Sequence, residues 1–318
     1  MNRKTLRTMA ASALAALSAV TTLSALMQCI QNPGTVTGTK PLTYVTPPPD
    51  WELVWQDEFN GTALDTTRWN YRLAHGCDVG QCGWGNRELQ YYTDHQNNVR
   101  VDSGHLIIEA HQEAVDSDSA HSQYTSGRIT TAGKGDWKYG KIEVRAKIPD
   151  GGDSLGCWPA IWMMPTDTVY GRWPKSGEMD LMEAFGPDMD TVHQSFHWWG
   201  GEGTTGSYVQ TIKAVHPDHK SWSEDFHDYS LVWTRESVTA FVDGQAYMTR
   251  KNNGSVRQYP YIEKFYLILN IAIGGTGFPS PAPFGLKRFP QTMQVDYVRV
   301  YRDRNLKPDS LEAKPGLL

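Results

Sequence analysis

The sequence lacks the features that mark helical proteins, repeat proteins and nucleic-acid-binding proteins. No long stretch has the 3.6-residue apolar period of an amphipathic helix, which argues against a helical protein. No internal repeat is found. The formal net charge is only −5 over 318 residues, without the basic excess of a nucleic-acid surface, so we expect no nucleic-acid partner. The length allows one large domain or two ordinary ones, with a substantial core.

Short strand patterns take the place of helices. Residues 141–148 alternate, with apolar side chains at the even positions, as in a strand with one buried face. Turn residues recur between such segments, and Asp243-Gly244 is a hairpin signal. The same interpretation applies to residues 53–55, 106–108, 229–233, 238–242, 265–273 and 295–301. Many short strands with frequent turns predict an all-β sandwich or jelly roll.

Cysteine is scarce, with four residues, of which Cys29 lies in the N-terminal segment. Cys77 and Cys82 bracket a short loop that contains glycine. In an oxidising compartment we expect them to form a local disulfide that stiffens this loop. Cys157 is left over inside an apolar run, where we expect it to be a small buried side chain.

The first segment has the composition of a targeting signal. Basic residues within 1–7 precede an Ala/Leu/Val-rich run over 9–27. This predicts a signal peptide at residues 1–29 and a secreted or cell-surface protein. Cleavage near Ala25 competes with a lipoprotein signal that would attach a lipid at Cys29, and an uncleaved anchor is a further alternative.

The composition changes again after this segment. Residues 30–50 are rich in proline and poor in large apolar side chains, which predicts a linker. Strand patterns begin at Trp51, so we expect one catalytic domain over residues 51–302. Residues 303–318 form a polar tail.

The most informative stretch is residues 177–186, where three carboxylates stand within six residues, separated by Met and Leu. On a strand of period two, Glu178 and Asp180 share one face, and Glu183 points to the other. One extra residue at 181–182, a β-bulge, would return Glu183 to the face of the other two acids. The opposite face would then carry apolar side chains, Met179 and Leu181.

Three acids on one face are electrostatically costly, so we interpret them as catalytic. A retaining glycosidase needs two carboxyl groups about 5–5.5 Å apart, one as nucleophile and one as acid/base. Glu178 and Glu183 suit this pair, and Asp180 can hydrogen-bond to one of them and raise the pKa of the other. A calcium loop would have Asp, Asn and Gly where this stretch has Met and Leu, and a solvated acidic edge would not alternate with apolar residues.

Aromatic residues around the acids favour a sugar ligand. The chain has 12 tryptophans, and sugar rings bind by stacking on aromatic planes. Trp158 and Trp162 are candidates for this role, with core packing as the alternative, and Trp173 precedes the acids in a Gly/Pro-rich loop. His193 and His197 share one face of the next expected strand. We expect His197 to bind sugar hydroxyls and His193 to be structural, with a metal pair as the alternative.

Residues 178–183 resemble the signature of glycoside hydrolase family 16 in its bulged form, and the resemblance extends over nearly all of residues 51–302. The matching segments look like those of laminarinases, which are endo-1,3-β-glucanases. They are residues 84–93, 126–129, 139–145, 158–162, 226–229, 242–244 and 295–301.

The resemblance implies a concanavalin-like jelly-roll sandwich of two antiparallel sheets with a concave cleft. It also implies endo-hydrolysis of β-1,3-glucan with retention of configuration, without a catalytic cofactor. By position, Glu178 is the nucleophile, Asp180 assists it and Glu183 is the acid/base. We expect a β-1,3-glucan polysaccharide as the partner, a monomer, and no membrane partner beyond a lipid anchor.

The resemblance also implies binding residues beyond the acids. Positions that line sugar subsites in such enzymes correspond here to Asn86, Arg128, Trp158, Trp162, Trp173 and His197. Many family members carry a structural calcium ion on the side opposite the cleft. Its ligands would be Glu58, the carbonyl of Gly104 and Asp296, which would clip the chain ends together.

Three other functions stay open on the sequence. An agarase or carrageenase of the same family would favour a cleft lined by Lys and Arg, and Arg172 and Lys175 lie close to the acids. A mixed-linkage glucanase would usually lack the bulge residue. A glucan-binding protein without activity would usually have lost an acid, and all three are present.

Overall fold

The structure is a computed structural model that describes residues 50–115, 123–153, 156–200, 206–276 and 288–305. The predicted signal peptide, almost all of the linker and the tail from residue 306 lie outside these residues. Within them, no helix is both long and apolar enough to cross a membrane.

One sheet carries eight strands, all paired antiparallel. It is built around β18, which pairs with three strands. Its order is β16 (Gln245–Lys251), β15 (Ser237–Val242), β14 (His227–Trp233), β9 (Gly140–Lys147), β18 (Gln291–Asp303), β5 (His105–Ala110) and β4 (Val99–Asp102), and β1 (Trp51–Asp57) also pairs with β18.

The second sheet also has eight antiparallel strands and carries the acidic stretch. Its order is β13 (Ser207–Val215), β12 (Asp188–Trp199), β11 (Glu178–Phe185), β10 (Cys157–Pro165), β17 (Phe265–Ile273), β7 (Arg128–Thr130) and β2 (Asn70–Tyr71), and β8 (Asp136–Trp137) also pairs with β17. Short elements complete the described chain, namely the 3₁₀ turns η1 (Cys77–Val79) and η2 (Cys82–Gly85) and the parallel pair β3 (Gln90–Tyr92) and β6 (Tyr124–Ser126).

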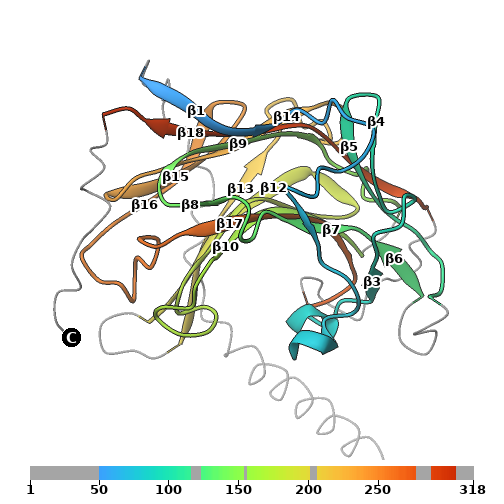
Figure 1. Ribbon diagram of the computed structural model, residues 1–318, viewed down its shortest axis with the longest axis horizontal. Coiled ribbons are helices and arrows are strands. Elements are labelled where there is room, and N and C mark those ends of the chain that lie inside the picture. The colour runs from blue at the N-terminus through green and yellow to red at the C-terminus, as the bar shows by residue number, and fades with distance from the viewer. Residues whose placement is uncertain (1–49, 116–122, 154–155, 201–205, 277–287, 306–318) are drawn as a thin grey trace, which may run out of the picture. The chain divides into compact units, whose positions relative to one another are not determined.

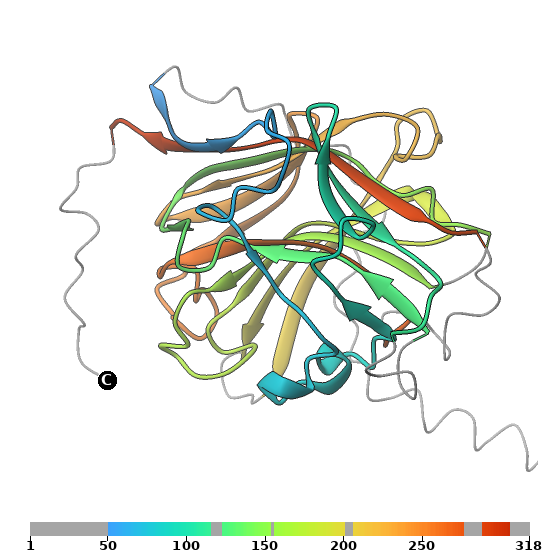
Figure 2. The same cartoon turned by 45° about the vertical axis from the view of Figure 1, so that its right-hand side comes forward.

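The two sheets lie face to face and enclose the core (Figures 1 and 2). The alternation predicted for β9 is confirmed, because Ile142, Val144 and Ala146 are fully buried. Met179 and Leu181 of β11 are also fully buried and belong to the same apolar cluster. Side chains of this size stabilise a fold by about 1.5–3 kcal/mol each when fully buried. The apolar face of β11 therefore fixes which way its acids point.

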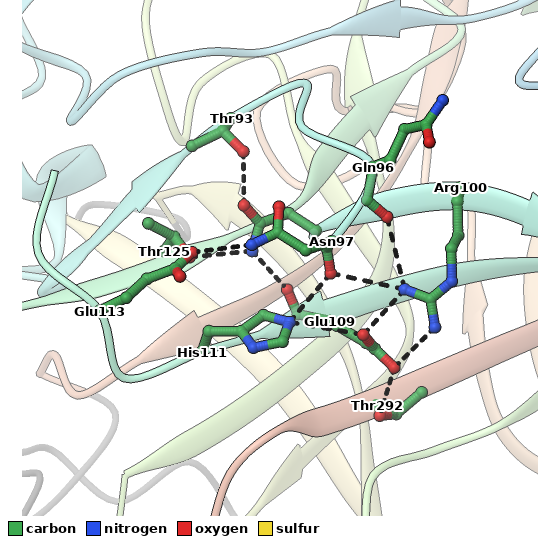
Figure 3. A network of polar contacts seen from close by, with 10 residues as sticks. Thr93, Gln96, Asn97, Arg100, Glu109, His111, Glu113, Thr125 and Thr292 are labelled. Carbon is green, nitrogen blue, oxygen red and sulfur yellow. Dashed lines mark hydrogen bonds and ion pairs between the residues drawn. The ribbon is translucent and has the colours of Figure 1, made fainter.

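A polar network fastens the edge strand β4 of the first sheet to β5 and β18 (Figure 3). Arg100 of β4 donates two hydrogen bonds, of 2.8 and 3.0 Å, to the carboxylate of Glu109 in β5. Thr292 of β18 donates to the same carboxylate at 3.1 Å. Because an arginine and a hydroxyl already satisfy this carboxylate, we interpret the network as structural.

Candidate active site

The bulge predicted in β11 is confirmed. Asp180 and Glu183 are three positions apart, yet they pair with Ser195 and His193 of β12, which are two apart. The register against β10 slips at the same point. One extra residue in β11 thus turns Glu183 to the face of Glu178 and Asp180, and all three line one cleft.

The cleft has a volume of about 950 Å³ and lies over the second sheet. Strands β2, β7, β10, β11, β12, β13 and β17 contribute to it, and so does the segment around η2. Aromatic side chains are prominent along it, namely Tyr71, Trp84, Trp158, Trp162, Trp173, Phe185 and Tyr266. Flat apolar rings beside a few polar groups are typical of a sugar-binding cleft.

Glu178 lies at the start of β11, where two neighbours hold its carboxylate. The indole nitrogen of Trp173 donates to Oε2 at 2.6 Å, and Nε2 of His197 lies 3.6 Å from Oε1. Trp173 is itself 51% exposed, so the donor reaches in from the rim of the cleft. Charge-assisted contacts of this kind fix a carboxylate in one orientation.

Asp180 is the most buried of the three acids, at 1% exposure. Nε2 of His197 lies 3.0 Å from its Oδ2. Burial, and then repulsion from Glu178 and Glu183, raises the pKa of Asp180 well above its ordinary value. The hydrogen bond and the charge of His197 oppose this rise.

Glu183 has the properties of a proton donor near neutral pH. Trp158 donates its indole N–H to Oε1 at 3.0 Å. Burial raises the pKa of Glu183 to about 7, with attraction from His197 opposing the rise and repulsion from Glu178 adding to it. A carboxyl with such a pKa can give up a proton and take it back at neutral pH.

Two histidines of β12 lie opposite the two glutamates. His197 is in register with Glu178, and His193 is in register with Glu183. Burial alone would lower the pKa of His197, but Glu178 and then Asp180 outweigh it and raise this pKa to about 10. Burial, helped by Lys213, lowers the pKa of His193 to about 4. At neutral pH one ring is therefore charged and the other neutral.

The comparisons with known proteins agree with this geometry. The sequence pattern of glycosyl hydrolases family 16 matches residues 85–298. The chain belongs to glycosyl hydrolase family 16. It is therefore a glycoside hydrolase with the jelly-roll sandwich of that family.

Two proteins of similar sequence and one solved structure illustrate the likeness. This family 16 chain is 40% identical over 270 residues to glucan endo-1,3-beta-glucosidase A1 of Niallia circulans. The aligned region covers 79% of this chain and 38% of that protein. It is 41% identical over 266 residues to a beta-glucanase of Rhodothermus marinus, covering 80% of this chain and 86% of that one. The laminarinase catalytic domain of Thermotoga maritima superposes with a TM-score of 0.71 at 40% identity, covering 80% of this chain and all of that one.

The binding residues expected from the sequence of this family 16 enzyme lie together in the cleft, namely Asn86, Arg128, Trp158, Trp162, Trp173 and His197. Two of them have partners that the sequence did not predict. The Arg128 guanidinium lies between Trp84 and Trp162, 4.4 and 5.0 Å from the ring centroids. Asn86 donates to the buried Glu88 at 3.1 Å.

Several cleft residues escaped the sequence analysis. Trp84 and Glu88 stand in the segment 84–93 that carries the family resemblance, so their position was a usable signal. Asn70 and Thr211 also line the cleft, but no motif marks them. Only the pairing of distant strands brings them there.

The structure joins Cys77 and Cys82 by a disulfide that spans η1 and the start of η2. The segment that follows carries Trp84 and Asn86 into the cleft. Cys157 is a free thiol in the core, where burial raises its pKa far above the ordinary value. A thiol in this state is unreactive.

The residues predicted to bind calcium have arginine partners. Glu58 accepts two hydrogen bonds, of 2.7 and 2.9 Å, from Arg299 of β18, and Asp296 lies 3.3 Å from Arg145 of β9. Gly104 forms the turn between β4 and β5. Carboxylates neutralised by arginine do not fit a cation site as they stand here.

Within the described ranges, one set of acids and histidine has ligand atoms within 4.8 Å of one another: Glu178, Asp180 and His197. Metal binding requires a neutral imidazole. The pKa of His197 is about 10, so its ring is protonated at neutral pH. In this structure His197 forms an ion pair with Asp180.

Proposed function

We propose that this enzyme is a secreted, retaining endo-hydrolase of β-1,3-glucosidic linkages in laminarin-type β-glucans. The observation that carries the proposal is the bulge in β11, which gathers Glu178, Asp180 and Glu183 on the floor of a cleft rich in aromatic side chains. The laminarinase and endo-1,3-glucosidase relatives support the choice of linkage.

In the first step Glu178 attacks the anomeric carbon, and Glu183 gives its proton to the leaving glycosidic oxygen. The bond from the anomeric carbon to that oxygen breaks as the bond to the Glu178 oxygen forms. Trp173 holds the attacking carboxylate, and the raised pKa of Glu183, about 7, keeps a proton available.

In the second step a water molecule hydrolyses the bond between the sugar and Glu178. Glu183, now a carboxylate, removes a proton from the water, whose oxygen attacks the anomeric carbon and releases Glu178. Two inversions give net retention. Asp180, between the two glutamates, forms the hydrogen bond with Nε2 of His197 at 3.0 Å.

The other activities considered from the sequence are less well supported. The cations that line the described cleft are Arg72, Arg128 and the protonated His197. Arg128 packs on two tryptophan rings and His197 contacts two acids, which is a weak basis for binding sulfated galactans. A non-catalytic glucan-binding role does not explain a glutamate whose pKa lies near 7.

A reducing-sugar assay on laminarin, agarose and barley mixed-linkage glucan tests the proposal. We expect reducing sugar to be released fastest from laminarin. The folded Glu178→Ala variant should release none. Preferred cleavage of agarose, or an active Glu178→Ala variant, would contradict it.

Localisation, assembly and calcium stay predictions. Secretion, with or without a lipid at Cys29, is tested by fractionating cells and determining the mature N-terminus. A monomer is tested by light scattering. Calcium at Glu58, Gly104 and Asp296 would require Arg299 to release Glu58. If calcium binds there, melting temperatures in calcium and in chelator will differ; equal values would count against it.

A further inference from the structure

His197 lies against the acids more closely than a sugar-binding side chain requires. Its Nε2 is 3.0 Å from Asp180 Oδ2 and 3.6 Å from Glu178 Oε1. Its side chain is 20% exposed, so only part of the ring is open to the cleft. The nitrogen that faces the acids is thus already engaged before any sugar arrives.

The position of His197 is fixed from two further sides. The hydroxyl of Tyr261 donates to the backbone carbonyl of His197 at 2.7 Å. The ring of Trp173 lies 5.9 Å from the imidazole, centroid to centroid. Trp173 also donates to Glu178, so one aromatic ring contacts both the acid and the histidine.

The charges around His197 are of one sign. From β11 it is faced by Glu178 and Asp180, with Glu183 further along. On its other flank β13 places the uncharged Val209 in register with it. Tyr261 approaches only its backbone. A cation here is opposed by three acids, and no neighbouring cation competes with it among these contacts.

We propose that His197 is a positioning residue for the catalytic acids. As an imidazolium it holds Asp180 in place and attracts the Glu178 carboxylate, so that the nucleophile is oriented before substrate binds. The inference rests on the proposed role of Glu178 as nucleophile. It replaces the role expected from the sequence, in which His197 binds sugar hydroxyls.

The kinetic test compares His197→Gln with a matched control, His105→Gln. His105 lies in β5 of the other sheet, with its ring stacked on Phe226. For His197→Gln we expect kcat to fall about 100-fold and KM to change less than about threefold, because the lost contact is to the acids. We also expect the basic limb of the pH profile, which Glu183 sets, to move to higher pH, because Glu183 loses the attraction from His197 that lowers its pKa.

The control should keep the wild-type profile. A His197→Gln enzyme with an unchanged pH profile and kcat but a KM raised tenfold would overturn the proposal, because that pattern belongs to a sugar-binding side chain. The assay uses whichever of the three polysaccharides the wild type cleaves. An error in the proposed substrate is therefore distinguishable from an error in the proposed role of His197.

A second measurement needs no substrate. In the wild-type protein with ¹⁵N-labelled histidine, we expect the His197 ring to show the nitrogen shifts of a doubly protonated imidazole up to about pH 9. The missing signal in His197→Gln identifies the resonance, and Asp180→Asn should lower its titration point. A His197 ring that titrates near 6.5 would overturn the proposal.

Discussion

Glu178 and Glu183 stand on either side of the bulge in β11 and have matching neighbours. Each accepts a hydrogen bond from an indole N–H, Trp173 for Glu178 and Trp158 for Glu183. Each faces a histidine of β12 in register. In these two respects the surroundings of the two glutamates match.

The two histidines break this symmetry. His197 carries a proton because two acids lie within 3.6 Å of its Nε2, whereas His193 lies against the ring of Phe185 and is neutral at neutral pH. The cation on His197 lies 3.6 Å from the Glu178 carboxylate. A buried glutamate beside a neutral ring keeps its proton more readily. Burial raises the pKa of Glu183 to about 7 and marks it as the proton donor, whereas Glu178 is the glutamate that the His197 cation contacts.

Removing each glutamate should produce the largest effect and assign its role. We expect Glu178→Ala and Glu183→Ala each to lose about 10³-fold or more in kcat. Azide should restore turnover in both, because a small anion can enter the vacated space. The product should be the α-glycosyl azide for Glu178→Ala and the β-azide for Glu183→Ala. The reverse pairing would exchange the two roles.

The two tryptophans should respond differently in a pH profile. The indole of Trp158 lowers the pKa of Glu183, so Trp158→Phe should move the basic limb of kcat/KM from about 7 to higher pH, by about half a unit. Trp173→Phe should lower kcat about tenfold without moving this limb. Equal shifts of the basic limb in both variants would mean that the indoles affect Glu183 through packing and not through the hydrogen bond from Trp158.

The disulfide loop tests whether the asymmetry is confined to the acids. A six-residue loop closed by Cys77 and Cys82 should contribute about 2 kcal/mol to stability. We expect the Cys77→Ser/Cys82→Ser enzyme to melt at lower temperature and to show KM raised about threefold, because the segment with Trp84 and Asn86 loosens. Its pH limbs should not move. A shifted limb would show coupling between this loop and the acids.

His193 should give the smallest effect, visible in stability. Its pKa is about 4 when folded and about 6.5 when unfolded, so between these values the unfolded chain binds the extra proton. Wild-type stability should therefore fall as pH drops from 6.5 towards 4. In His193→Gln we expect a smaller drop in melting temperature between pH 7 and 5, with His105→Gln as the control. An identical drop in all three proteins would contradict a neutral His193.

Much of this site could be predicted because its pattern is local. The spacing of Glu178, Asp180 and Glu183 conflicts with period two unless a bulge intervenes, and the apolar residues between them fix the buried face. The fold class followed from the short alternating segments and the turns between them.

What the sequence did not reveal depends on register between distant strands. Arg299 and Arg145 meet the two acids predicted to bind calcium only because β1, β18 and β9 pair as they do. The protonation of His197 likewise depends on which residues of β11 it faces. Neither contact is encoded in a contiguous motif. The calcium site rests on the resemblance to the family and stays a prediction, as does the sugar contact expected for His197.

The most direct test of the two roles is to trap the intermediate. A 2-deoxy-2-fluoro laminari-oligosaccharyl fluoride slows both steps but keeps a good leaving group, so the glycosyl-enzyme should accumulate. Mass spectrometry of the proteolysed protein should place the sugar on Glu178. A label on Glu183, or hydrolysis of the same compound without any covalent adduct, would contradict the account.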